Sequence, residues 1–151
     1  MFDNFEVRDF SRSGKSNVIG SNIMLASSHP IASSIGIEIL KSGGNAVDAA
    51  IAMNAVLCIA EPHMTGVGGD CFVMLSVDGS TNVKALNGSG KSSSNARAST
   101  LRKNKLSLIT PEMPDAITIP GAVAAWSLLH KEHGYMPVSY THLTLPTTLI
   151  V

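Results

Sequence analysis

Aromatic side chains and net charge are both scarce in this sequence. Phe, Trp and Tyr make up 5% of the 151 residues, and 11 Lys and Arg residues are balanced by 11 Asp and Glu residues. Few aromatic rings leave little surface for stacking on nucleic-acid bases. A balanced charge gives no long-range attraction to nucleic acid or to an anionic membrane. We therefore expect neither of these as a partner.

Cysteine is scarce as well, and no membrane-length apolar run is present. Cys58 and Cys71 lie inside apolar runs with no histidine at ligand spacing, which predicts free buried thiols in a reducing compartment and no metal site. The longest apolar stretch, residues 46–60, is interrupted by Asp48 and is too short to span a bilayer. Residues 1–16 are polar, lack the apolar core of a secretory signal and are expected to form a flexible arm. A cytoplasmic location is expected.

Two consecutive helices are predicted in the first half of the chain. The first begins at Pro30, with Ser27, Ser28 and His29 as candidate caps, and carries Ile31, Ile35 and Ile39 on one face before Gly43 and Gly44 end it. The second runs over residues 46–60. Asn45 and Asp48 form a variant of the capping box, and the helix is apolar nearly all round, which predicts burial on several sides.

A β-hairpin and a further helix are predicted after these two helices. Residues 71–77 read as a strand covered on both faces, and the turn at Asp78 and Gly79 leads into a partner strand at 83–86. Residues 87–99 read as a loop. Short strands are expected at 23–26 and 116–119, and a helix over residues 121–133 with Val123, Trp126 and either Leu129 or His130 on its apolar face. The fold class is α/β (α+β), with a sheet that is at least partly antiparallel.

The glycine-rich segment EPHMTGVGGD (residues 61–70) does not fit a phosphate-binding loop. Gly66, Gly68 and Gly69 follow a helix and precede a strand, whereas such loops place a helix N-terminus against the phosphate. The segment GSGKS (88–92) lacks the earlier glycine of a P-loop. Nucleotide binding is therefore disfavoured, and the glycine-rich segment is interpreted as a bend into a core strand.

Other polar residues have competing interpretations. His130 and His133 lie three residues apart on a predicted helix, where they are either metal ligands or cations at a helix C-terminus, and the latter is favoured for want of a third ligand. Glu61 and Asp70 flank the glycine-rich segment, and they either do acid/base work or accept backbone N–H groups of the turn, which is the favoured interpretation. His63, beside them, is expected to bond the local backbone.

The last residues break the compositional pattern. MPVSYTHLTLPTTLIV (136–151) contains no Asp, Glu, Lys or Arg, and Thr and Leu dominate it. It is either a terminal strand or a stretch that resembles translated sequencing-adapter tails. We favour the second interpretation and expect residues 138–151 to be a non-native or disordered tail.

Three runs of the sequence, taken together, resemble one family. They contain GGNAVDAA (43–50) with EPHMTGVGGD (61–70), then KALNGSG (84–90), then AITIPGAVAAWSLLHKEHG (116–134). They look like the N-terminal part of the γ-glutamyltranspeptidase (glutathione hydrolase) family, over residues 17–137. The resemblance implies the αββα sandwich of N-terminal-nucleophile hydrolases, of which this chain would supply the N-terminal portion.

The resemblance also implies a reaction that these residues do not reveal by themselves. Members of the family are precursors that cut themselves into a large and a small subunit, and the new N-terminal Thr of the small subunit attacks an amide with its own α-amine as base. The acyl group then passes to water or to an acceptor amine. No cofactor is implied. That Thr would lie beyond this sequence, so no catalytic residue is assigned within it, and the chain alone is expected to be inactive.

One substrate contact is implied within the chain. Glutathione-cleaving relatives carry an Arg after the KALN-like strand to clamp the substrate α-carboxylate, and Ser89 occupies that position here. This places γ-glutamyl recognition in doubt. The pattern Gly-Ser-Gly followed by a basic residue is similar to the branch that includes oxamate amidohydrolases, with Lys91 standing where that branch has Arg. Lys91 is either a substrate contact or a solvated loop lysine. Ser89 and Lys91 are thus the candidate substrate-binding residues.

A different class of function remains open beside the amide-cleaving enzyme. The chain is alternatively a stand-alone, non-catalytic scaffold or binding domain that uses half of the same sandwich. The two hypotheses differ in what they require of the isolated chain. A scaffold must fold cooperatively as written, whereas half of a sandwich exposes large apolar patches and aggregates.

Overall fold

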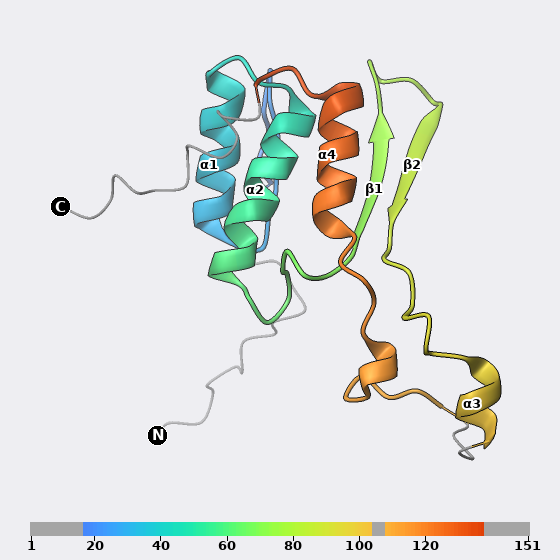
Figure 1. The fold of residues 1–151 in the computed structure, drawn as a ribbon. Helices are drawn as coiled ribbons and strands as arrows, with labels where there is room; N and C mark the ends of the chain where they lie inside the picture. Colours follow the sequence, from blue (N-terminus) through green and yellow to red (C-terminus); the bar gives the residue numbers. More distant parts are fainter. Residues whose placement is uncertain (1–16, 104–107, 138–151) are drawn as a thin grey trace, which may run out of the picture.

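The computed structural model describes residues 17–103 and 108–137 of the chain. In Figure 1, α1, α2 and α4 lie side by side and the β1–β2 hairpin lies beyond α4, while α3 lies apart from them on the connection that follows β2. The hairpin is a two-stranded antiparallel sheet. The elements in chain order are α1 (Pro30–Lys41), α2 (Ala46–Ala60), β1 (Cys71–Ser76), β2 (Val83–Gly88), α3 (Ala98–Lys103), the short 3₁₀ helix η1 (Pro114–Ala116) and α4 (Ala122–His133).

Helix α1 has its start fixed by the residue that precedes it. His29 Nδ1 accepts a hydrogen bond from Ile31 N at 3.2 Å, and Pro30 occupies the first turn, where a missing N–H costs nothing. Ile35 and Ile39 are buried as predicted. Ile31 is 50% exposed, contrary to the prediction, because α1 turns its small residues toward α2.

Helix α2 starts with a capping box and buries two opposite faces. Asn45 Oδ1 accepts from Val47 N at 2.9 Å and from Asp48 N at 3.1 Å, and Asp48 Oδ2 accepts from Asn45 N at 2.9 Å. One face packs on α1 in what we call the helix-pair core, and the other joins α4 and the hairpin in the hairpin core. The helix-pair core consists of Ala32, Ile35, Ile39, Ala49, Ala52, Met53 and Val56, and the hairpin core is built on Val47, Ile51, Ala122, Trp126 and Leu129. The predicted burial on several sides is confirmed.

A buried carboxylate ties the start of α2 to the residues that follow α4. Asp48 is fully buried, and its Oδ2 accepts hydrogen bonds from Tyr135 N at 3.1 Å and Met136 N at 3.2 Å in addition to the capping bond. Asn45 Nδ2 donates to His133 O at 2.6 Å. Burial of a charged group is costly unless it is hydrogen-bonded, and here backbone N–H groups supply those bonds. The two residues of the capping motif therefore also bind the backbone of residues 133–136, a long-range contact that the local pattern does not predict.

The hairpin forms as predicted, but only one of its faces is covered. Its turn has positive φ at Asp78 (55°) and Gly79 (67°), which suits an Asp-Gly turn. Val73 and Leu75 point toward the hairpin core, whereas Phe72 and Met74 are 70% and 79% exposed. The prediction of two-sided burial is therefore wrong for the part of the chain that the structure describes, because α2 and α4 pack on one side of the hairpin only.

Helix α4 covers the inner face of the hairpin. Trp126 and Leu129 are buried against β1 and β2, as the sequence pattern predicts. Val123 is 52% exposed, and the buried face instead includes Ala122 and Ala125, which allow a close approach to the hairpin. The assignment of Val123 to the apolar face is therefore wrong by one position along the helix.

Several short segments differ from their predictions. Residues 23–26 form no strand. The region predicted as a strand at 116–119 contains the end of η1 and a single antiparallel bridge between Thr118 and Ser92. The predicted loop 87–99 is bounded by the end of β2 at Gly88 and the start of α3 at Ala98. The predicted arm at 1–16 and the predicted tail at 138–151 lie outside the described residues. Within the described residues, the structure contains no helix of the length and apolarity needed to cross a membrane.

Candidate substrate-binding site

Three loop segments meet at the end of the hairpin where β1 begins and β2 ends. They are Gly69–Asp70, which leads into β1, residues 88–91, which leave β2, and residues 118–122, which lead into α4. Gly121 N and Ala122 N both donate to Gly69 O at 3.0 Å. These are the first N–H groups of α4, which helical bonding leaves unpaired. The glycine-rich segment therefore caps α4 through the carbonyl oxygen of Gly69 and continues into β1. This agrees with its interpretation as a bend that leads into a strand.

Asp70 connects all three segments through its side chain. Its Oδ1 accepts hydrogen bonds from Gly90 N at 2.8 Å and from Thr118 Oγ1 at 3.0 Å, and its Oδ2 lies 3.4 Å from Ser89 Oγ. Asp70 accepts a backbone N–H group, as the favoured interpretation expects, but the prediction is wrong about the donor, which belongs to the loop after β2 rather than to the glycine-rich segment. Thr118 was not singled out from the sequence, and only its place in the AITIPG run marked it.

Three glycines allow these segments to approach closely. A Cβ atom on Gly90 would overlap the carbonyl oxygen of Ile119, and one on Gly121 would overlap the carbonyl oxygen of Gly88. A Cβ atom on Gly88 would overlap the side chain of Ala125 in α4. Ile119 N also donates to Lys91 O at 2.9 Å. The loop 88–91 is therefore held on its backbone at several points, which is the rigidity that a substrate-contacting loop needs.

The two candidate substrate residues both lie on this loop and are exposed. Ser89 N donates to Asn87 Oδ1 at 2.9 Å, which leaves the Ser89 hydroxyl on the side of Asp70. Lys91 is held through its backbone carbonyl rather than through its side chain. The structure thus places Asp70 against Ser89 and Gly90 of this loop, a neighbour that the sequence pattern does not associate with them, and Lys91 follows directly in the loop.

The hydrogen bonds to Asp70 lower its pKa. The Gly90 N–H group is the main cause, the hydroxyl groups of Thr118 and Ser89 add to it, and partial desolvation opposes them. A carboxyl group whose pKa is lowered by folding stabilises the fold above its unfolded pKa, and this contribution is lost as the pH falls through the folded value. At neutral pH, Asp70 is therefore ionised and the loop is held.

We expect the attachment of this loop to persist at neutral pH and to be lost only below the ordinary aspartate range, about 3.9. An NMR titration of the Asp70 carboxyl carbon, with the Gly90 amide shift followed in the same samples, measures both events. Both signals should move together at a pH below that range. An Asp70 midpoint at or above the ordinary value would contradict the hydrogen-bonded geometry.

The other polar candidates do not join this site. Glu61 Oε2 accepts a hydrogen bond from Ser28 Oγ at 2.6 Å, so Glu61 closes the N-terminal side of the glycine-rich segment rather than pairing with Asp70. Cys58 and Cys71 are free thiols that pack at the edge of the hairpin core, and burial raises the pKa of Cys58. Among the described residues, no group of three or more His, Cys, Asp or Glu side chains has metal-binding geometry.

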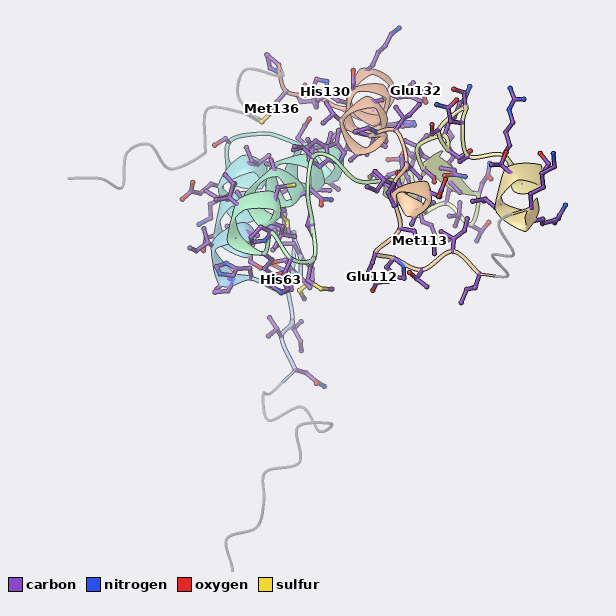
Figure 2. All side chains as sticks on the ribbon, turned by 60° about the horizontal axis from the view of Figure 1, so that its bottom comes forward. His63, Glu112, Met113, His130, Glu132 and Met136 are labelled. Carbon is purple, nitrogen blue, oxygen red and sulfur yellow. The ribbon has the colours of Figure 1, made fainter. Side chains whose placement is uncertain are left out.

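The two histidines of α4 have separate environments. His130 Nε2 lies 2.7 Å from Met136 O and 3.7 Å from Asp48 Oδ1, so it belongs to the connection around Asp48. Figure 2 shows His130 and Met136 on the opposite side of the molecule from His63. His133 Nε2 instead lies 3.9 Å from Glu132 Oε2. Their positions in the last turn of α4 match the favoured interpretation as helix C-terminal groups.

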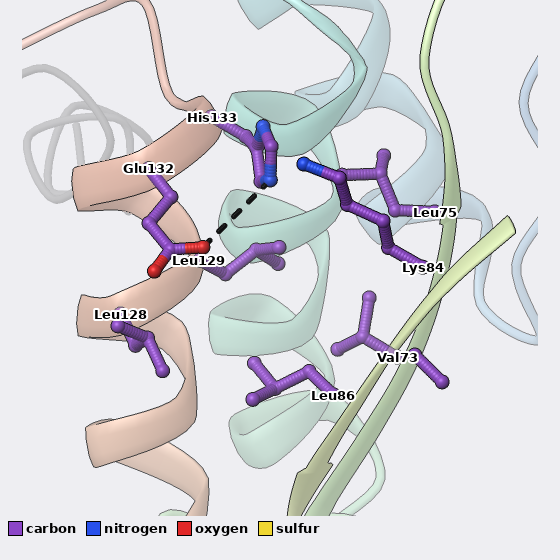
Figure 3. Close-up of a pocket in the computed structure, with 9 residues that line it drawn as sticks. Val73, Leu75, Lys84, Leu86, Leu128, Leu129, Glu132 and His133 are labelled. Carbon is purple, nitrogen blue, oxygen red and sulfur yellow. Dashed lines mark ion pairs between the residues drawn. The ribbon is translucent and has the colours of Figure 1, made fainter. Parts of the chain in front are cut away.

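A cavity of about 380 Å³ lies between α4 and the hairpin. Figure 3 shows Leu128 and Leu129 of α4 facing Val73 and Leu86 of the hairpin, with Lys84 and the Glu132–His133 pair at one end. Most of its lining is aliphatic, and Leu129, Val73, Leu75 and Leu86 of the lining belong to the hairpin core or pack against it. Its lining includes neither Ser89 nor Lys91, so it is separate from the loop that carries them.

Comparisons with known proteins agree with this arrangement. The sequence model described as Gamma-glutamyltranspeptidase matches residues 32–146. The glutathione hydrolase-like YwrD proenzyme of Bacillus subtilis (strain 168) is 41% identical over 123 residues, which cover 82% of this chain and 23% of that protein. The chain therefore spans about a quarter of the length of this relative.

Solved structures show the same likeness. The cephalosporin acylase from Bacillus halodurans is 33% identical with a TM-score of 0.76, over 91% of this chain and 26% of that one. The Helicobacter pylori gamma-Glutamyltranspeptidase is 28% identical with a TM-score of 0.72, over 83% of this chain and 37% of that one.

The mixed helix and hairpin arrangement is the N-terminal portion of the N-terminal-nucleophile hydrolase sandwich, as the sequence predicts. The chain belongs to the γ-glutamyltranspeptidase family, which confirms the resemblance on which that prediction rested.

Proposed function

We propose that this chain is the N-terminal part of the large subunit of a self-processing amidohydrolase or acyltransferase. We call the longer protein that contains it the parent protein. Its nucleophile would be the N-terminal Thr of a small subunit released by self-cleavage, on polypeptide outside residues 1–151. Relatives that are named proenzymes, of which this chain spans about a quarter or less, support this proposal. We also propose a cytoplasmic location, where free thiols such as Cys58 persist.

The observation that carries the proposal is the uncovered face of the hairpin. Phe72 and Met74 of β1 are 70% and 79% exposed, and Val83 of β2 is 50% exposed on the same face. An αββα sandwich places a second sheet against this face, with the two inner faces about 10 Å apart. We propose that the small subunit of the parent protein supplies strands of that second sheet.

The proposed reaction uses this chain for substrate binding rather than for bond breaking. The Thr hydroxyl attacks the amide carbonyl while its α-amine takes the proton, the amine leaves, and water or an acceptor amine then takes the acyl group. Ser89 and Lys91 would line the pocket at the end of the hairpin. Lys91 offers a single ammonium group rather than the planar fork of an arginine, so it fixes a substrate carboxylate less rigidly. The proposed substrates are small amides, with γ-glutamyl compounds disfavoured by Ser89.

The parent protein provides the direct test of this function. Purified from its full reading frame, it should separate into two subunits, and the N-terminal residue of the smaller one should be Thr by mass spectrometry. Substitution of that Thr by Ala should abolish both self-cleavage and amide hydrolysis. An intact, uncut and active parent protein would contradict the proposal.

The scaffold hypothesis is tested on the isolated chain. The double substitution Phe72→Thr and Met74→Thr keeps strand propensity while it removes exposed apolar area. If the face is an unfilled interface, the soluble fraction of the isolated chain should rise by about 3-fold or more, and the parent protein with the same changes should melt several degrees lower. Soluble yield and thermal denaturation measure the two effects. A monodisperse, cooperatively melting isolated chain that the substitutions do not improve would favour the scaffold.

A further inference from the structure

We propose, on the basis of the function proposed above, that Asp70 is a specificity-determining residue. Its negative charge would exclude a substrate carboxylate from the Ser89 position and favour a group with N–H donors there. The substrate class that follows is small amides with a primary amide or ammonium group at this position. The family resemblance implies that a γ-glutamyl compound presents its α-carboxylate at this position where relatives carry Arg.

The two oxygens of Asp70 have different environments. Oδ1 takes both short hydrogen bonds, from Gly90 N at 2.8 Å and from Thr118 Oγ1 at 3.0 Å. Oδ2 has only the longer contact with Ser89 Oγ, at 3.4 Å, among the described residues. Because Asp70 is exposed, Oδ2 has accessible lone pairs beside Ser89. One oxygen therefore holds the loop, and the other leaves negative charge accessible beside Ser89.

The Ser89 hydroxyl reinforces this polarity. Since an ionised carboxylate only accepts hydrogen bonds, the Ser89 hydroxyl is the donor in its 3.4 Å contact with Asp70. The lone pairs of the Ser89 oxygen are then left as acceptors for a ligand. Two neighbouring acceptors match a primary amide or an ammonium group, whereas a carboxylate would meet like charge and find no donor.

The Lys91 ammonium group could bind a carboxylate at another position of the substrate. It lies two residues beyond Ser89, and its backbone is held by Ile119 N at 2.9 Å. A small amide that carries its carboxylate toward Lys91 and its N–H groups toward Ser89 satisfies both charges. Ser89 and Lys91 would then select both the charge of the substrate and the direction in which it binds.

The same geometry predicts that restoring the family arginine is not sufficient. In Ser89→Arg, the new guanidinium group would lie beside Asp70 and form a bidentate pair with its carboxylate. That pairing competes with a substrate carboxylate. Recognition of a γ-glutamyl compound should therefore need Ser89→Arg and Asp70→Asn together, and the two changes should be strongly non-additive.

The test compares two ligands of the parent protein that differ only in charge, a γ-glutamyl anilide and its α-carboxamide analogue. Asp70→Asn keeps an oxygen at the Oδ1 position for Gly90 N and Thr118, and it removes the charge. It should raise the preference for the carboxylate ligand by about 3- to 10-fold, through KM rather than kcat, as expected for an exposed charge pair. Asp70→Ala removes the loop attachment and should weaken turnover of both ligands.

Asp78→Asn is the matched control, because it makes the same change of charge at the far end of the hairpin. Asp78 has a φ of 55°, which Asn tolerates. The ligand preference of this variant should stay at the wild-type value. Isothermal titration calorimetry with the same ligands gives the ratio of Kd values without turnover, so a parent protein that fails to cut itself would contradict the proposed function and still test Asp70. An unchanged preference in Asp70→Asn, or an equal change in Asp78→Asn, would overturn the inference.

Discussion

Replacement of Asp48 by Ala is expected to destabilise the parent protein by about 3–5 kcal/mol, the largest stability effect that we predict. Asp48 is fully buried, and its Oδ2 accepts N–H groups of Asn45, Tyr135 and Met136. Removal of the carboxylate leaves these backbone donors buried without partners and opens a cavity between α2 and the end of α4. The apparent melting temperature should fall by about 10 °C, or soluble protein should be lost.

Asp48→Asn keeps the shape of the side chain but replaces one acceptor oxygen with an NH2 donor, so it tests the hydrogen bonds separately from the packing. Its amide oxygen can replace Oδ2, but its NH2 group then replaces Oδ1. There it faces the N–H group of Tyr135, which is also a donor, and His130 Nε2, which is already bonded to Met136 O. We expect an intermediate loss of stability, about 1–3 kcal/mol. Glu38→Gln, on the exposed side of α1, is the control and should change stability by less than about 0.5 kcal/mol. Differential scanning calorimetry should give this order, and equal melting of Asp48→Ala and the control would refute the role of the buried carboxylate.

The largest effect on activity is expected from Gly90→Ala in the parent protein. The added Cβ would overlap the carbonyl oxygen of Ile119, which belongs to the backbone and cannot rotate away. The loop must then move outward, which breaks the bond from Gly90 N to Asp70 and shifts Ser89 and Lys91. Because we propose that this loop contacts the substrate, a displacement of about 1 Å should lower kcat/KM by about 100-fold. Steady-state kinetics on a small amide substrate measures this loss.

Gly68→Ala is the matched control for that experiment. It makes the same substitution in the neighbouring glycine-rich segment, where no atom of the described residues lies within 4 Å of the added Cβ. Its kcat/KM should stay within about 3-fold of the wild-type value. A similar loss in both variants would mean that the site tolerates no added methyl group in general, and wild-type activity in Gly90→Ala would show that the loop does not contact the substrate.

The helices and the hairpin were predictable because their signals are local. Asn45 and Asp48 mark the start of α2 by their spacing, Pro30 marks the start of α1, and the Asp78-Gly79 pair marks the turn of the hairpin. Each depends on dihedral preferences and hydrogen bonds within a few residues. Their bounds in the structure therefore differ from the predicted ones by no more than a few positions.

The buried faces were less predictable because they depend on neighbours. Ile31 and Val123 fit the apolar spacing of their helices but are half exposed, since small residues make the closest contacts with the next element. Phe72 and Met74 were expected to be covered, and they are exposed because the described residues provide a helix layer on one side only. An apolar pattern states that a face needs covering, and it does not state what covers it.

The sequence by itself determined the family, the two capped helices and the hairpin, because these depend on residue identity and short-range spacing. Only the tertiary structure placed Asp70 beside Ser89, across a separation of 19 residues, and joined Asp48 to residues that follow α4. Both contacts form between loops that the packing of α4 on the hairpin brings together. Their charge and polarity therefore become visible only once the chain has folded.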